Sequence, residues 1–233
     1  MGQDVFRDYA VISTIPGGGM GMIYHVAHKE TQKEFAIKTV TTQQHDDADW
    51  KEKFLNEAVL MAKLDDHPHI VKLHKVTTDG DKIYLVMDYI PGKDLGKILK
   101  QEKSLTFLES EEIFLAIAKA LQYTHTFNII HRDIKPANIL ISNEDPRQIK
   151  LVDFGLAKFS AKPSLQTIDH GDAVFGSIFF MAPEQFERTA LDQRTDMYSL
   201  GAMFYYTLTG SYPFDGESAP QVMASHLQGS VFP

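Results

Sequence analysis

Three polar side chains that could do chemistry lie close together between isoleucines in residues 130–141. Asp133 could accept a proton, Lys135 could stabilise a developing negative charge, and Asn138 offers a carbonyl oxygen to a hard cation such as Mg²⁺. A segment with this set of side chains is better suited to chemistry than to packing. The three roles together are those that phosphoryl transfer requires.

A further carboxylate, Asp153, follows the apolar residues Leu151 and Val152. It precedes Phe154 and Gly155, where the glycine frees the backbone to turn. Asp153 would supply a second oxygen ligand to the metal.

Three motifs in the chain resemble those of the protein kinase family. His-Arg-Asp-x-x-x-x-Asn ends at Asn138, Asp-Phe-Gly begins at Asp153, and Ala-Pro-Glu ends at Glu184. The alternative is a coincidental set of polar loop residues, but three motifs in this order rarely arise by chance. The resemblance implies an α+β, two-lobed fold with ATP between the lobes. A small antiparallel β-sheet lobe with one helix would span 1–88, and a larger, mainly helical lobe, incomplete at its C-terminus, would span 89–233.

Composition fits a soluble globular protein, with 43% hydrophobic and 23% charged residues among 233. The net charge of -8 argues against general nucleic-acid binding. The chain has no cysteine, which excludes disulfides and thiolate metal sites. The acidic N-terminus is no signal peptide, and no apolar run approaches the length of a membrane span. We therefore expect a soluble, cytoplasmic protein.

A glycine-rich hairpin is predicted near the N-terminus, with strands at 9–15 and 22–28. Neither a helix nor Gly-Lys-Ser/Thr follows the glycines, which excludes dinucleotide-binding and Walker loops. In the family such a loop covers the phosphates, and Gly18 and Gly21 match its second and third glycines. Pro16 replaces the first glycine, so a plain flexible turn remains an alternative.

Two charged residues are predicted to be buried together. Lys38 lies between apolar neighbours in a strand at 35–40, and Glu57 faces the core from a helix at 49–64 whose apolar face is Phe54, Ala58, Met61 and Ala62. Either charge buried alone would cost several kcal/mol, so we expect the two to pair, although snorkelling surface charges are the alternative. The resemblance implies that Lys38, held by Glu57, contacts the α- and β-phosphates.

Strands at 70–77 and 82–88 would complete a five-stranded antiparallel sheet. The resemblance implies a pocket for adenine at the end of this sheet. Met87 would lie behind the base, and the backbone of Asp88 and Ile90 would bond the purine edge. The base itself would be sandwiched by Ile15, Ile23, Ala36 and Leu140.

Four helices are predicted after the linker at Pro91 and Gly92. Thr106 and Glu109 form a capping box that opens a helix ending near residue 127. The others span 94–101, 192–209, which reads as fully buried, and 219–228. By resemblance, Asp196 is a buried aspartate that holds the backbone of the catalytic loop.

The stretch between Asp153 and Glu184 has few helix or strand signals and resembles an activation segment. A phosphate on Ser164 or Thr167 could pair with Arg132 and order the segment, although an unmodified loop is equally compatible. Ser177 keeps a hydroxyl that can contact Asp133 and Lys135.

These residues predict a protein serine/threonine kinase with ATP and Mg²⁺ as cofactors and a protein substrate; oligomeric state is not predicted. Asp133 would deprotonate the acceptor hydroxyl, and Lys135 would stabilise the transferring phosphoryl group. Lys135 favours serine or threonine over tyrosine as acceptor, by resemblance. One alternative is a pseudokinase or truncated fragment that acts as a binding module. Another is a small-molecule kinase, which would lack the Ala-Pro-Glu segment.

Overall fold

The structure is a computed structural model that describes residues 5–16, 21–41, 50–62, 67–153, 176–187 and 190–229. The chain forms two compact units. The first comprises the described residues within Met1–His67 together with Val71–Ile90. The second comprises Pro68–Ile70 and the described residues from Pro91 onward.

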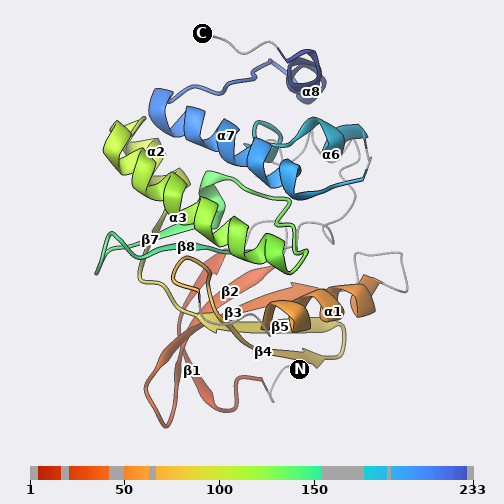
Figure 1. Ribbon diagram of the computed structural model, residues 1–233. Helices are drawn as coiled ribbons and strands as arrows, with labels where there is room; N and C mark the ends of the chain where they lie inside the picture. Colours follow the sequence, from red (N-terminus) through yellow and green to blue (C-terminus); the bar gives the residue numbers. More distant parts are fainter. Residues whose placement is uncertain are drawn as a thin grey trace. The chain divides into compact units, whose positions relative to one another are not determined.

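The first unit is built on a five-stranded antiparallel sheet with the strand order β1-β2-β3-β5-β4 (Figure 1). The predicted sheet and its single helix are thus confirmed. The strands are β1 (Tyr9–Pro16), β2 (Met22–His28), β3 (Glu34–Thr41), β4 (Leu73–Asp79) and β5 (Lys82–Asp88), and the helix is α1 (Trp50–Ala62).

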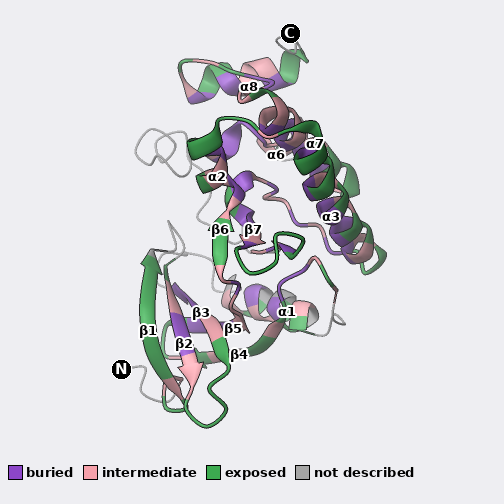
Figure 2. Ribbon diagram, turned by 90° about the vertical axis from the view of Figure 1, so that its left-hand side faces the viewer, coloured by how far each residue is buried: buried purple, intermediate pink, exposed green. Residues whose placement is uncertain are grey.

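The two faces of this sheet follow the alternation of side chains along each strand. One face carries the core cluster Val26, Ile37, Tyr84 and Val86, against which Phe6 packs. The opposite face carries Lys38, which is 1% exposed. The edge strand β1 is exposed along most of its length (Figure 2).

Two predictions for this unit are corrected. The strand predicted at 70–77 begins only at Leu73, because Ile70 forms a parallel bridge with Leu151 in the second unit. In α1, Phe54 and Ala58 are buried as predicted, but Ala62 is exposed because the helix ends there.

The second unit is mostly helical. Its helices are α2 (Leu95–Glu102), α3 (Phe107–Thr126), α6 (Pro183–Glu187), α7 (Gln193–Thr209) and α8 (Ala219–Gln228). It also contains a small antiparallel sheet that the sequence did not predict, with strands β6 (Gly92–Asp94), β7 (Ile139–Ser142) and β8 (Ile149–Leu151). A 3₁₀ turn, η2 (Pro136–Asn138), leads into β7. None of the helices in the described ranges is long and apolar enough to cross a membrane.

Helices α3 and α7 pack against each other and position the loop between α3 and η2 (Figure 1). The capping box predicted for α3 is present, with the Thr106 hydroxyl and the Glu109 carboxylate each bonding the other's backbone N–H. Helix α7 ends at Gly210 in the left-handed conformation. The prediction that α7 is fully buried is wrong, because Met197 is 48% exposed on its outer side.

Candidate active site

The three side chains singled out in residues 130–141 lie together. Lys135 Nζ and Asn138 Nδ2 both donate to Asp133 Oδ2, at 2.8 Å and 2.9 Å. Asn138 Nδ2 also donates to the carbonyl of Asp133 at 2.7 Å. These bonds use neither Asp133 Oδ1 nor Asn138 Oδ1, so both oxygens remain available to a substrate or a cation.

His131 connects this loop to the segment that carries Asp153. Its Nδ1 accepts the N–H of Asp133 at 3.2 Å, so the proton is on Nε2, which donates to the carbonyl of Val152 at 2.9 Å. The N–H of Val152 in turn donates to the carbonyl of Asn138 at 3.0 Å. Asp153 therefore follows directly after Val152, a residue that is bonded to both His131 and Asn138.

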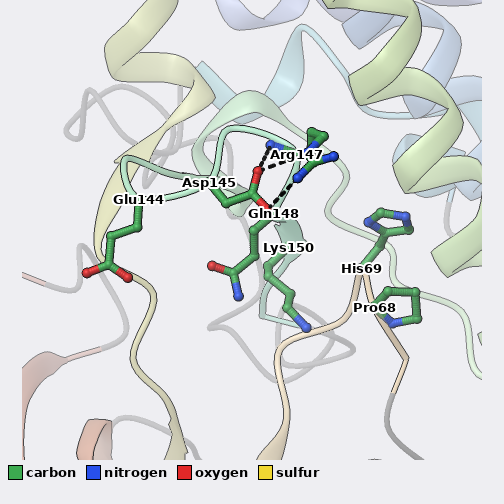
Figure 3. A pocket seen from close by; sticks show the side chains of 7 residues that line it. All are labelled: Pro68, His69, Glu144, Asp145, Arg147, Gln148 and Lys150. Carbon is green, nitrogen blue, oxygen red and sulfur yellow. Dashed lines mark hydrogen bonds and ion pairs between the residues drawn. The ribbon is translucent and has the colours of Figure 1, made fainter.

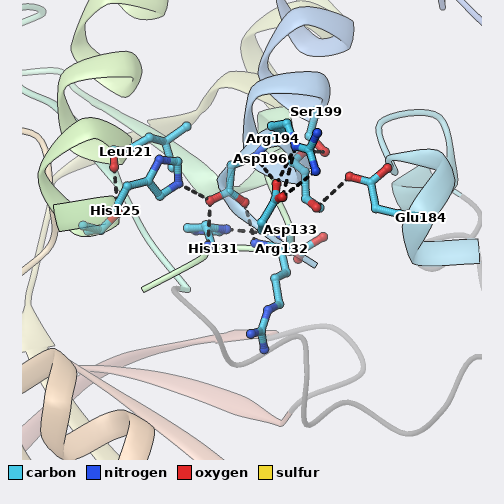
Figure 4. Close-up of polar contacts among 12 residues, drawn as sticks. Leu121, His125, His131, Arg132, Asp133, Glu184, Arg194, Asp196 and Ser199 are labelled. Atoms are coloured by element: carbon cyan, nitrogen blue, oxygen red, sulfur yellow. Dashed lines mark hydrogen bonds and ion pairs between the residues drawn. The ribbon is translucent and has the colours of Figure 1, made fainter. Parts of the chain in front are cut away.

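The backbone at Arg132 and Asp153 adopts the left-handed conformation, with φ of 67° and 63°. Such angles are strained for residues other than glycine and persist only where the surroundings hold them. Asp196, buried in the first turn of α7, holds the first of them. Its Oδ2 accepts the N–H of His131 at 2.9 Å, and its Oδ1 accepts the N–H of Arg132 at 2.7 Å (Figure 4).

Two residues of this network were missed in the sequence. His125, near the end of α3, bonds Asp196 Oδ2 through Nε2 at 2.8 Å. It follows the buried Leu121 by four positions, so helical periodicity could have placed it on the buried face. Gln185 donates from Nε2 to the carbonyl of Arg132 at 2.9 Å, and nothing in the sequence marked it.

In the first unit, the predicted nucleotide-binding residues share one face of the sheet. Ile23 lies opposite Ile15 in β1 and Lys38 in β3, and Ala36 lies opposite Met87 in β5. Residues that face each other across antiparallel strands, or that are two apart on one strand, point to the same side. These five residues therefore form one surface.

The other predicted nucleotide-binding residues either lie outside this surface or are not fully described by the structure. Asp88 ends β5, Ile90 is 9% exposed two residues later, and Leu140 lies in β7 of the second unit. Glu57 lies in α1, but its side chain, like all of Gly18, lies outside the described residues. The predicted pairing of Lys38 with Glu57 therefore stays a prediction.

Gly21 has a structural reason to be glycine, whatever it binds. Its φ is 125°, and a Cβ at this position would lie 2.1 Å from the carbonyl oxygen of Thr39. The close approach of the hairpin to β3 excludes any side chain here.

Asn138 and Asp153 suit a magnesium ion in ligand type. Carbonyl and carboxylate oxygens are the ligands that Mg²⁺ prefers, and in phosphoryl-transfer sites protein side chains supply only one or two of them. The described residues contain no group of three or more His, Asp or Glu side chains that could hold a metal by themselves.

The predicted regulatory residues are described only in part. Ser164 and Thr167 lie outside the described residues. The guanidinium of Arg132 extends away from Asp196 (Figure 4), and its buried Nε finds no hydrogen-bond partner in the described ranges. Ser177 accepts a hydrogen bond from Lys135 Nζ at 2.8 Å, one of the two contacts that we expected of its hydroxyl.

Aromatic stacking fixes the residues that follow Ser177. Phe179 stacks on Tyr212 at 3.9 Å, and Tyr212 stacks on Tyr206 of α7 at 4.6 Å. Phe180, in an edge-on arrangement, contacts both tyrosines. Burial within this cluster raises the pKa of Tyr212 to about 12.

His226 of α8 lies in a second aromatic cluster. It is 2% exposed, its Nδ1 bonds the hydroxyl of Tyr198 at 2.8 Å, and Phe214 lies 4.5 Å from its ring. Burial lowers the pKa of His226 to about 4 from 6.5, and the backbone of Ile178 opposes that shift only in part.

The shifted pKa of His226 predicts a loss of stability in acid. Above pH 6.5 the ring is neutral in both states, but between pH 6.5 and 4 only the unfolded chain takes up the proton. The free energy of unfolding should fall by up to about 3 kcal/mol across this range from His226 alone. Urea unfolding at several pH values, for the wild type and His226→Phe, measures this difference. Parallel pH profiles for the two proteins would contradict it.

A separate hollow of about 540 Å³ lies in the second unit, lined by Pro68, His69, Glu144, Asp145, Arg147, Gln148 and Lys150 (Figure 3). None of the predicted site residues lines it. Its cationic groups are already engaged, because Arg147 pairs with Asp145 at 3.2 Å and Lys150 Nζ donates to the carbonyl of Ile70 at 3.1 Å. We assign it no ligand.

The comparisons with a family model and with solved structures point to the same family. The family model for the protein kinase domain matches residues 9–232. The chain also superposes on a crystal structure of Rad53 in complex with AMP-PNP, with a TM-score of 0.79, 28% sequence identity, and coverage of 98% of this chain and 55% of that one.

Curated relatives are bacterial serine/threonine-protein kinases. PrkC of Bacillus subtilis is 35% identical over 99% of this chain and 35% of its own length. PknF of Mycobacterium tuberculosis is 34% identical over 97% of this chain and 48% of its own length. A probable serine/threonine-protein kinase of Clostridium perfringens is 34% identical over 100% of this chain and 33% of its own length. The chain thus spans a third to a half of these relatives.

Proposed function

Because the chain belongs to the protein kinase domain family, we propose that it is an ATP-dependent protein serine/threonine kinase. The observation that carries this proposal is the arrangement around Asp133. Lys135 and Asn138 both bond Oδ2, which orients the carboxylate and leaves Oδ1 for the acceptor. Asp133 would take the proton of a serine or threonine hydroxyl while that oxygen bonds the γ-phosphorus and the bond to ADP breaks.

Lys135 has a second role in this proposal. Its Nζ lies 2.8 Å from both Asp133 Oδ2 and Ser177 Oγ, so the ammonium is held in place by two contacts. A fixed cation beside the base would stabilise the charge that develops on the transferring phosphoryl group. Bound Mg²⁺ would neutralise phosphate charge, and Asn138 and Asp153 are the residues that would hold it.

The first unit would bind the rest of the nucleotide. Lys38, with Glu57, would contact the phosphates beneath the loop of Gly18 and Gly21. The N–H of Asp88 already donates to the carbonyl of Lys72 at 3.0 Å, so we assign its carbonyl oxygen, rather than its N–H, to the purine. The N–H of Ile90 would bond the same edge. Ile15, Ile23, Ala36, Met87 and Leu140 would enclose the base.

Regulation and context are part of the same proposal. A phosphate on Ser164 or Thr167 would pair with Arg132, because the buried Nε of Arg132 has no hydrogen-bond partner among the described residues and could bond a group from another segment.

The two lobes would divide after residue 88, two residues before the end of the first compact unit. The protein would act on protein substrates and in the cytoplasm. The relatives named above favour a protein substrate over a small molecule.

Phosphoryl transfer from labelled ATP to a generic basic protein, with Mg²⁺, tests the proposal. Wild type should transfer label, whereas Asp153→Ala, which removes a proposed metal ligand, should lose about 10²-fold or more. Asp145→Ala removes an exposed carboxylate of the second unit and should match wild type. Equal transfer by wild type and Asp153→Ala would reject the kinase assignment.

A further inference from the structure

His25 lies on the surface proposed to bind nucleotide, although the sequence gave it no role. In β2 it is opposite Ala36 of β3, which in turn is opposite Met87 of β5. Because it is two residues from Ile23, its side chain points to the same face as Ile23 and Lys38. His25 is 9% exposed, so a polar ring is buried beside the residues assigned to the purine.

The ring of His25 lies flat against Tyr89. Their centroids are 3.5 Å apart and their planes differ by 10°. Nε2 of His25 also bonds Glu34 Oε2 at 3.0 Å, which fixes the orientation of the ring. Tyr89 lies between Asp88 and Ile90, the two residues whose backbone is assigned to the purine edge.

The residue before Tyr89 is held from the other face of the sheet. Asp88 is opposite Phe35, and its Oδ1 bonds His74 Nε2 at 2.7 Å and lies 3.6 Å from Lys33 Nζ. Its N–H is bonded to Lys72. Asp88, the last residue of β5, is therefore held by contacts on one face of the sheet, and Tyr89, the next residue, is held by His25 on the opposite face.

We propose that His25 is a positioning residue for the nucleotide: by stacking on Tyr89 it fixes residues 88–90 and so raises the affinity for the purine. The inference rests on the proposed nucleotide binding. Backbone groups that are oriented before the base arrives bind it more tightly, because a linker that must be ordered on binding weakens affinity. Loss of an aromatic pair of this kind is expected to raise the dissociation constant of the nucleotide by about three- to tenfold.

The test is the dissociation constant of Mg·ADP, measured by calorimetry on the whole chain. His25→Leu and Tyr89→Leu should each weaken binding by about three- to tenfold. The double variant should be no weaker than the weaker single variant, because both changes remove the same contact. His25→Phe keeps a stacking ring and should stay close to wild type. The melting temperature of each variant without nucleotide reports whether it folds.

His28→Leu is the matched control, since it replaces a histidine of the same strand that contacts Tyr9 and lies on the opposite face. It should bind Mg·ADP as wild type does. If folded His25→Leu binds as tightly as wild type, or if the two single effects add in the double variant, His25 only packs and the inference fails. If wild type itself does not bind Mg·ADP, the proposed function fails, and the inference with it.

Discussion

Replacing Asp133 by asparagine is expected to lower turnover by about 10²- to 10⁴-fold while the protein stays folded. The carboxamide oxygen can take the place of Oδ2 and accept the hydrogen bonds from Lys135 and Asn138. The amide nitrogen then occupies the place of Oδ1, where it cannot accept a proton. The change therefore removes the base and keeps the arrangement that holds it.

Steady-state transfer of labelled phosphate measures the effect of Asp133→Asn, with the Mg·ADP dissociation constant as the control. ADP lacks the transferring group, so its affinity should change little. Turnover within tenfold of wild type would show that Asp133 is not the base.

Replacing Asp196 by alanine is expected to lower the free energy of unfolding by about 3–5 kcal/mol. Its side chain is 0% exposed. Its loss would leave the N–H groups of His131 and Arg132 and the ring of His125 without their acceptor in the interior. Each unsatisfied buried donor costs about 1–3 kcal/mol, and the left-handed backbone at Arg132 would lose the contact that holds it.

Urea unfolding compares Asp196→Ala with Asp192→Ala, a matched change at the start of the same helix. Asp192 caps α7 and pairs with Arg194, but its side chain is 49% exposed. Its removal should therefore cost only about 1 kcal/mol. Turnover should fall for the first variant and stay near wild type for the second. Similar losses of stability in both variants would contradict the conclusion that the buried hydrogen bonds of Asp196 stabilise the fold.

Elements set by local signals were predicted well. The capping box of α3 and the bounds of α8 agree with the structure, because caps and helical periodicity act within a few residues. The five strands of the first sheet were predicted from the alternation of side chains along each strand and from the glycine-containing turns in the sequence. The cluster of Asp133, Lys135 and Asn138 was predicted because the three residues are close in sequence.

Distant contacts were predicted only where the family resemblance supplied them, as for Asp196 with His131 and for Ser177 with Lys135. Ile70 looks like a strand residue of the first sheet, yet it pairs with Leu151, whose identity as a partner no local pattern reveals. Helix α7 was taken as fully buried from its apolar composition, which does not say which side of a helix meets a neighbour. Gln185 has no local signal at all, since its partner is the carbonyl of Arg132, 53 residues earlier.

The contact of Asp196 with the backbone of His131 and Arg132 can form only late in the synthesis of the protein. Asp196 lies 65 residues after His131, so a ribosome adding about 5–20 residues per second makes it several seconds after the loop. Until then the left-handed turn at Arg132 lacks the carboxylate that holds it. A nascent chain that already contains the His-Arg-Asp motif therefore still lacks the acceptor for the N–H groups of His131 and Arg132, and we expect the loop to reach its final conformation only after α7 has been made.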